Sequence, residues 1–265
     1  MNNNLSKLDV FSRGMKLTFS PKEIFSEIFR MKKSRSIYLW VLQLVEVASF
    51  LIVFANGKFQ FAPDFSLIPV LSLIAGITEI FSVVADADGL ISNYFWGIIN
   101  NIAYIWVSYD SHLYGEVYLN LLFLVTQFIG IYLWYSKNEM AGAKNVNTVQ
   151  VKQMSGTGWI FLLIFTVIAW LLMAMFLMHV PFLSATLDPH PWLDALSTVT
   201  NVVAQFLLIT RYGTPQFIMW IIGNGIETIL WVVNFNPIVA MFWLLCTINA
   251  FYGWYVWEKK LSHQS

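Results

Sequence analysis

Long uncharged apolar runs are the feature that most limits how this chain can fold. Several stretches of roughly 18 or more residues carry almost no charge, about the length that a helix rising 1.5 Å per residue needs to cross 30 Å of hydrocarbon. Hydrophobic residues make up 58% of the 265 residues and charged residues 11%, whereas soluble proteins are about one quarter charged. A membrane β-barrel would instead show short alternating segments. The sequence therefore predicts an all-α integral membrane protein.

Hydropathy and turn residues predict about eight transmembrane helices. The expected ranges are 37–55, 66–85, 91–109, 116–135, 157–179, 193–210, 214–233 and 237–257. The connections rich in Lys and Arg fall on the side of the basic N-terminal arm, and four acidic residues fall on the other side. These are Asp64, Asp110, Glu116 and Asp188. By the positive-inside rule, both termini are expected in the cytoplasm.

Residues 1–36 are expected to form a cytoplasmic basic arm. The stretch Ser20–Lys33, SPKEIFSEIFRMKK, places Ile24, Phe25, Ile28 and Phe29 at helical spacing with charged residues opposite. This pattern is typical of a short helix that lies on the membrane surface. A disordered basic tail is the alternative.

Two similar segments lie far apart in the sequence. WGIIN runs from Trp96 to Asn100, and WIIGN runs from Trp220 to Asn224. Further along, Gly130 and Trp134 match Gly253 and Trp257. The chain is therefore predicted to contain a repeat, with one three-helix unit at 66–136 and a second at 193–258.

Because three is odd, a second unit in the same orientation needs a linker helix, which residues 157–180 supply. Residues 37–56 are then an additional helix. This SWEET-like 3+1+3 plan with parallel repeats is a transporter architecture, in which substrates bind near mid-membrane between the repeats.

Amides inside the predicted spans are the main candidates for a solute path, because an unpaired amide in hydrocarbon costs several kcal/mol. Interleaved with aromatic residues, they give the candidate substrate-binding set Trp96, Asn100, Tyr104, Gln127, Asn201, Gln205, Trp220, Asn224, Asn249 and Tyr252. Each could instead hydrogen-bond one helix to another. Such a lining suits a flat ring with hydroxyls, and a tryptophan face attracts a cation by roughly 0.5–2 kcal/mol.

Three carboxylates, Glu46, Glu79 and Glu227, also lie inside predicted spans. Intramembrane ionisable residues are candidates for function, so Glu79 and Glu227, together with Trp192 of a connecting loop, extend the candidate set. Proton coupling would need a relay of Asp, Glu or His, but the histidines lie near span ends or in the tail. Structural pairing or ligand contact is therefore favoured over proton coupling.

The doubled Trp-x3-Asn, the segment NNIAYIWVSYDSHLYGE and the segment QFIGIYLW resemble the PnuC family of bacterial vitamin transporters, over about Tyr38 to Lys260. The resemblance implies a SWEET-like homotrimer in the bacterial cytoplasmic (inner) membrane. It also implies facilitated diffusion of nicotinamide riboside, trapped by cytoplasmic phosphorylation for NAD biosynthesis. Thiamine or riboflavin is the alternative substrate within that family. The spans hold no basic cluster for a phosphate, so nicotinamide mononucleotide is expected to be a poor substrate.

Other classes of protein have weaker support. The sequence contains no GxxxxGK[ST] and no HExxH, which argues against ATP hydrolysis and a zinc protease. Asp86 and Asp88 form a short acidic pair that could bind a metal, but a solvated turn before Gly89 is the favoured interpretation. We therefore expect no catalytic residue, metal, cofactor or nucleic-acid partner. A receptor or scaffold that moves no solute is the remaining alternative, and Cys246 is expected to be a core residue.

Overall fold

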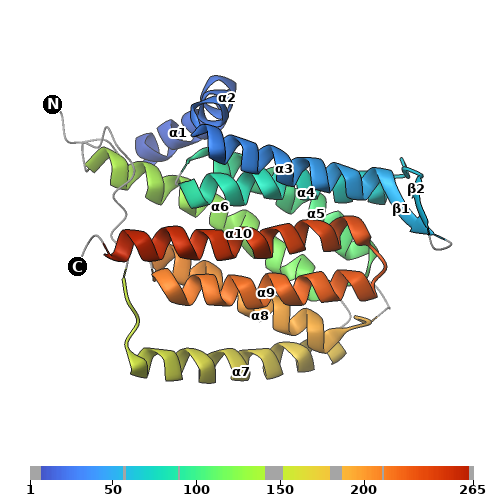
Figure 1. The fold of residues 1–265 in the computed structure, drawn as a ribbon. Helices are drawn as coiled ribbons and strands as arrows, with labels where there is room; N and C mark the ends of the chain where they lie inside the picture. Colours follow the sequence, from blue (N-terminus) through green and yellow to red (C-terminus); the bar gives the residue numbers. More distant parts are fainter. Residues whose placement is uncertain are drawn as a thin grey trace.

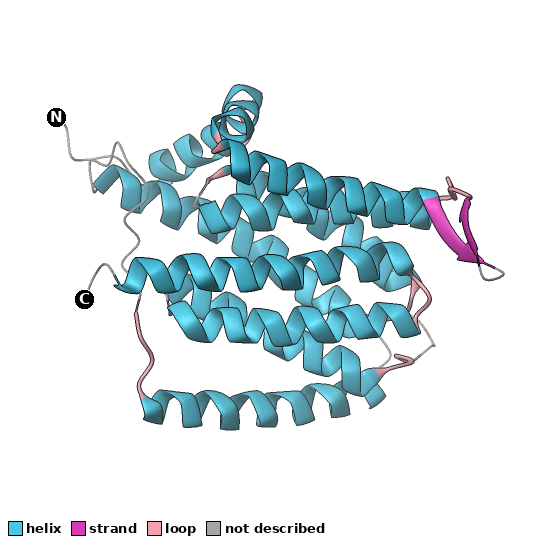
Figure 2. Ribbon diagram, viewed as in Figure 1, coloured by secondary structure: helices cyan, strands magenta, loops and turns pink. Residues whose placement is uncertain are grey.

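The computed structural model describes residues 7–55, 58–88, 90–140, 152–179, 187–210 and 212–262. Within these residues the fold is a bundle of helices with one short β-hairpin (Figures 1 and 2). The elements are α1 (Lys7–Thr18), α2 (Pro21–Arg30), α3 (Lys33–Leu51), β1 (Ile52–Ala55), β2 (Lys58–Phe61), α4 (Leu67–Asp88), α5 (Ser92–Asp110), α6 (Tyr114–Met140), α7 (Gly156–His179), α8 (Pro191–Thr210), α9 (Gly213–Val233) and α10 (Pro237–Ser262).

Five of the described helices are long and apolar enough to cross a membrane. They are α4, α6, α7, α9 and α10. Helices α3, α5 and α8 are 19, 19 and 20 residues long and overlap the other predicted ranges. These three carry buried polar residues, among them Gln43 and Glu46 in α3, Asn100 and Asn101 in α5, and Asn201 in α8. The prediction of an all-helical membrane protein is confirmed, apart from the hairpin.

The first predicted span is shifted by four residues. Helix α3 runs from Lys33 to Leu51 rather than from 37 to 55, and it ends there because β1 pairs antiparallel with β2, with Ile52 opposite Phe61 and Ala55 opposite Lys58. β-Branched and aromatic residues in this stretch favour a pleated strand. We call this end of the bundle the hairpin end. At the opposite end, the terminal end, α1 begins and α10 finishes (Figure 1).

The N-terminal arm is folded from Lys7 onward. Helix α2 covers most of the predicted surface helix, and α1 is an additional helix that the sequence pattern did not indicate. A Cβ atom at Gly14 of α1 would lie 3.0 Å from Ile131 Cγ2 of α6, so these two helices pack closely. The carboxylate of Glu27 in α2 accepts a hydrogen bond from the Ser92 backbone N–H at 3.0 Å. The described part of the arm is therefore docked on α5 and α6 and is not a disordered tail.

The long helices form two triples that pack in the same way. Helices α4, α5 and α6 pack in chain order, as do α8, α9 and α10, and α4 also contacts α10 while α6 contacts α8. The first helix of each triple thus contacts the third helix of the other. The matched glycines behave alike, since Gly130 lies against Tyr94 of α5 and Gly253 lies against Phe217 of α9.

Two helices flank the triples. Helix α3 packs on α4 and α10, and α7 packs mainly on α8, along one side of the bundle (Figure 1). Large apolar side chains of α7 are exposed, including Ile160, Phe161, Leu163 and Phe165. Such a surface suits contact with lipid tails or with another chain.

Candidate functional site

Tyr104 stands at the centre of a buried group of polar side chains between the two triples. Its hydroxyl accepts hydrogen bonds from the indole N–H groups of Trp231 and Trp243. The same hydroxyl lies 3.3 Å from Glu227 Oε2 and 3.4 Å from Glu116 Oε2. Asn201 Nδ2 donates to Glu227 Oε1 at 3.1 Å. Tyr104, Glu116, Asn201, Glu227, Trp231 and Trp243 are called the polar centre below.

Four carboxyl groups form a continuous chain that includes part of this centre. The Tyr104 hydroxyl lies between Glu227 and Glu116, and Ser197 Oγ bonds both Glu116 Oε1 and the Asp194 carbonyl oxygen. Asp194 and Asp188 accept from the adjacent backbone N–H groups of Gly115 and Tyr114. Asp188 is 6% exposed and the other three are fully buried. Asp188 accepts from the backbone N–H of Tyr114 at 3.1 Å, close to the start of α6 at the hairpin end. This carboxyl chain, Asp188 to Glu227, therefore leads from the hairpin end into the bundle.

Glu116 is the main residue that sequence reasoning missed. The sequence places it at the first residue of the predicted span 116–135, among the acidic residues outside the membrane, whereas it lies in the first turn of α6 with its carboxyl inside the bundle. Ser197 Oγ donates to Glu116 Oε1 at 2.7 Å. Glu116 lies inside the bundle because α6 approaches α8 closely. Gly115 leaves room for the Asp194 carboxylate of α8, and the Gly115 backbone N–H donates to that carboxylate at 2.7 Å. The glycine beside the glutamate was the available signal.

The two matched asparagines make different contacts. Asn100 Nδ2 donates to the carbonyl oxygen of Ala75 in α4 at 3.0 Å, which is the helix-bridging role. Asn224 is equally buried, but its Oδ1 has no hydrogen-bond partner among the described residues. The second asparagine is therefore the better placed of the two to receive a solute.

The matched tryptophans also differ. Trp96 stacks on Phe81 of α4, with ring centroids 4.6 Å apart, and Trp220 meets Phe123 of α6 edge to face at 6.2 Å. Both side chains are half-buried. The two tryptophans therefore pack against different helices, Trp96 against α4 and Trp220 against α6.

The remaining predicted candidates from α4, α6 and α8 are spread over the bundle. The amide of Gln127 lies against Gly97 of α5. Gln205 and Glu79 are half-buried. Trp192 is 45% exposed and its carbonyl accepts from Trp170 Nε1 of α7 at 3.0 Å. These residues are not part of the polar centre.

Asn249 and Tyr252 gather around Arg35 of α3, nearer the terminal end. The Arg35 guanidinium lies 4.9 Å from the ring centroid of Tyr38 and 4.4 Å from that of Tyr252. It also donates to Val84 O at 3.3 Å and to Asn249 Oδ1 at 3.5 Å. Asn249 Nδ2 in turn donates to Val83 O of α4. This arrangement clamps α3 to α4 and α10.

Glu46 of α3 is a buried acid outside the polar centre. Its carboxylate is fully buried against Gly76 of α4, and neither of its oxygens has a hydrogen-bond partner among the described residues. The described residues contain no group of three or more His, Cys, Asp or Glu side chains that could hold a metal ion. The interpretation of Asp86 and Asp88 as a solvated turn stays a prediction, because the side chain of Asp88 lies outside the described residues.

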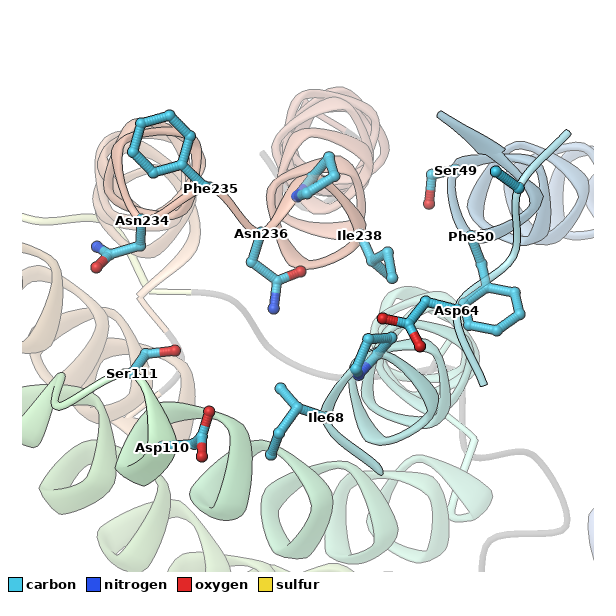
Figure 3. A pocket seen from close by; sticks show the side chains of 13 residues that line it. Ser49, Phe50, Asp64, Ile68, Asp110, Ser111, Asn234, Phe235, Asn236 and Ile238 are labelled. Carbon is cyan, nitrogen blue, oxygen red and sulfur yellow. The ribbon is translucent and has the colours of Figure 1, made fainter. Parts of the chain in front are cut away.

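A pocket of about 340 Å³ opens at the hairpin end. Its wall includes Asp64, Asp110 and Asn236, whose side chains surround the space in Figure 3. The Ser66 backbone N–H donates to Asp64 Oδ1 at 2.8 Å, and this hydrogen bond lowers the pKa of the exposed Asp64 carboxyl. The pocket therefore carries negative charge at neutral pH, and it is large enough for a small organic solute.

Comparisons with known proteins agree on one family. The chain matches the family described as "Nicotinamide mononucleotide transporter" over residues 69–259. It is 34% identical over 193 residues to a Haemophilus influenzae protein named "Nicotinamide riboside transporter PnuC", covering 72% of this chain and 80% of the relative. A protein of the same name from Neisseria mucosa is 32% identical over 215 residues, with 78% and 77% covered.

A solved structure described as "Crystal structure of the Vitamin B3 transporter PnuC" has the same fold. It superposes with a TM-score of 0.68 at 27% identity, covering 89% of this chain and 94% of that one. Sequence and structure agree, and the chain belongs to the PnuC family of multi-pass membrane transporters, which are not enzymes.

Proposed function

We propose that this protein takes up nicotinamide riboside by facilitated diffusion. The observation that carries the proposal is the charge of the interior. The sequence has no Lys or Arg at residues 59–136, 153–210 or 212–258. These ranges include both triples except the terminal-end residues of α6 and α10, and the polar centre holds buried carboxyls, an amide and aromatic rings. A pyridinium cation that also carries ribose hydroxyls and a carboxamide matches each of these groups.

The same interior distinguishes the riboside from its phosphate. The description of the matching family names nicotinamide mononucleotide as the solute. The names of the relatives from H. influenzae and N. mucosa give nicotinamide riboside instead. A phosphate would bring about two negative charges toward buried carboxyls. The polar centre contains no Lys or Arg to balance them, and the buried Arg35 is bonded to Val84 and Asn249 nearer the terminal end. We therefore favour the riboside and expect cytoplasmic phosphorylation to trap it for NAD biosynthesis.

Charge alone does not separate nicotinamide riboside from thiamine, because both are cations, although it disfavours neutral riboflavin. The names of the relatives favour the riboside over thiamine. We propose that the solute contacts five residues: Tyr104, Glu116, Asn201, Asn224 and Glu227. The path from the entrance to these residues is lined by Trp96, Gln127, Gln205 and Trp220, and the pocket at the hairpin end is that entrance.

We infer eight crossings in a SWEET-like 3+1+3 plan. The reciprocal contacts of α4 with α10 and of α6 with α8 support a twofold arrangement of the two triples, with α7 as linker and α3 as the additional helix. The basic arm and the Lys259 end of α10 lie at the terminal end, which supports a cytoplasmic location for both termini in an inner membrane. The exposed apolar side of α7 supports contact with lipid and with neighbouring chains of a homotrimer.

Binding to the purified protein tests the substrate. Nicotinamide riboside, its mononucleotide, thiamine and riboflavin would be titrated side by side by calorimetry under one set of conditions. We expect binding of the riboside and at least a tenfold weaker response to each of the other three, since each loses a matched group or adds unpaired charge. Equal affinity for the riboside and the mononucleotide would contradict the proposal.

A further inference from the structure

Glu116 and Glu227 bring two carboxyl groups to one hydroxyl inside the bundle. Both are fully buried, and the Tyr104 hydroxyl lies 3.4 Å from Glu116 Oε2 and 3.3 Å from Glu227 Oε2. A hydroxyl has a single hydrogen to donate, so it cannot satisfy two carboxylates at once, and a buried charge without a partner is costly. The geometry therefore favours a pair that holds one proton.

The groups that face this pair come from every helix around it. Helix α5 contributes the Tyr104 hydroxyl, α8 contributes Ser197, Asn201 and Asp194, and α10 contributes the Trp243 indole behind Tyr104 and the thiol of Cys246. Within the described residues, the partners of the pair are hydroxyl, amide, indole and carboxyl groups. No Lys or Arg precedes position 259 in α8, α9 or α10. A solute that brings a positive charge would therefore supply what the protein lacks.

The carboxyl chain gives the proton a route out. From Glu116 it passes by Ser197 to Asp194. Asp194 and Asp188 lie on neighbouring backbone N–H groups, those of Gly115 at 2.7 Å and Tyr114 at 3.1 Å. Glu227 lies about six residues, or roughly 9 Å, before the end of α9 at the hairpin end. The described chain of acids thus leads to that end of the bundle.

We propose that the Glu116–Glu227 pair selects cations, and that a positively charged pyridinium nucleoside binds there by displacing the shared proton. This inference rests on the proposed function. The exchange is balanced, since a protonated carboxyl and a cationic solute give a carboxylate–cation pair and one proton, which leaves through Asp194 and Asp188. Because the proton leaves and returns by the hairpin end, the exchange makes affinity depend on pH without driving accumulation.

Calorimetry on the unmodified full chain tests the exchange without any substitution. Nicotinamide riboside would be titrated at pH 6 and pH 8 in two buffers with different ionisation enthalpies, so that the buffer dependence of the heat gives the number of protons released. The matched control ligand is dihydronicotinamide riboside, which has almost the same shape but no charge.

For the cation, we expect release of up to one proton per solute and an affinity that rises by up to about tenfold per pH unit. The neutral ligand should bind more weakly, release no proton and show no change in affinity with pH. If the cation binds with the same affinity at both pH values and releases no proton, the inference is overturned. If neither ligand binds, the proposed function fails instead.

Substitutions then assign the effect to the pair. Glu227→Gln and Glu116→Gln keep the shape and a hydrogen-bonding group but remove the exchangeable proton, so either variant should abolish proton release and the preference for the cation. Glu258→Gln at the exposed far end of α10 is the control and should behave like the unmodified protein. A folded Glu227→Gln protein with full proton release would contradict the assignment of the proton to this pair. If Glu227→Gln does not fold, the same measurement on Glu116→Gln tests the assignment.

Discussion

Asn100 and Asn224 occupy matching positions in the two triples, yet only one of them has its amide bonded across helices. Asn100 Nδ2 lies 3.0 Å from the Ala75 carbonyl oxygen. Asn224 Oδ1 is buried without a hydrogen-bond partner in the described part of the chain. An unsatisfied buried acceptor costs about 1–3 kcal/mol, and a donor on a bound solute would recover that cost.

Replacing each asparagine by alanine should therefore have different consequences. Asn224→Ala is expected to weaken solute binding by roughly 10- to 100-fold, because the solute loses an acceptor, with little loss of stability. Asn100→Ala should lower the free energy of unfolding by about 1–3 kcal/mol, because the Ala75 carbonyl loses its donor, while affinity changes less. Calorimetric binding and thermal unfolding in detergent measure the two effects.

One result would contradict this role for Asn224. If the Asn224→Ala protein unfolds at a lower temperature but binds solute with full affinity, Asn224 only packs helices. The polar path proposed between the triples would then need different residues.

Some of this organisation could be predicted from the sequence. The long helices could be predicted because a helix that crosses a membrane needs a long apolar run. The repeat stays a prediction, based on the spacing that Trp96/Asn100 and Trp220/Asn224 share. The partners of the buried polar groups could not be predicted, because they depend on how helices approach one another. Glu116 illustrates this. Its position at a span end suggests a residue outside the membrane, and only the packing of α8 against Gly115 shows that its side chain is enclosed.

Helix α1 and the hairpin were missed for local reasons. Residues 7–18 are too polar to give a membrane signal, and α1 is held by its contact with α6 around Gly14. Residues 52–55 continue an apolar run, so hydropathy extends the preceding span to Ala55, whereas strand pairing ends the helix at Leu51.

The docking of the arm depends on the small residue in α1. A Cβ atom at Gly14 would lie 3.0 Å from Ile131 Cγ2 and 3.2 Å from Tyr135 Cβ. Gly14→Val should therefore separate α1 from α6 and raise hydrogen exchange in residues 7–18 by tenfold or more. Ser12→Val, at an exposed position of the same helix, is the matched control. Equal protection in both variants would show that α1 does not depend on this contact.

The Arg35 clamp predicts a purely structural effect. The guanidinium contacts the Tyr38 and Tyr252 rings and donates to Asn249. Arg35→Ala should lower the free energy of unfolding by about 1–3 kcal/mol and leave solute affinity nearly unchanged. Lys22→Ala removes one charge from an exposed position and is the control. It should change neither the free energy of unfolding nor the solute affinity. A large loss of affinity in folded Arg35→Ala protein would instead place Asn249 and Tyr252 in the solute path, as the sequence pattern suggested.

The oligomeric state has its own test. If the exposed apolar side of α7 faces lipid and neighbouring copies, the protein in mild detergent should have a polypeptide mass three times that of the 30.5 kDa chain. Light scattering on a size-exclusion column, corrected for bound detergent, measures that mass. A single-chain mass at all protein concentrations would contradict the homotrimer.

Uptake into vesicles that contain only the purified protein and buffer is the most direct test of the account. Labelled nicotinamide riboside should enter until the internal and external concentrations are equal, with no further accumulation after a pH step or a sodium gradient, and the mononucleotide should remain outside. Uptake no faster than in protein-free vesicles would contradict transport and favour a receptor or scaffold. Accumulation above the external concentration under a proton gradient would contradict facilitated diffusion.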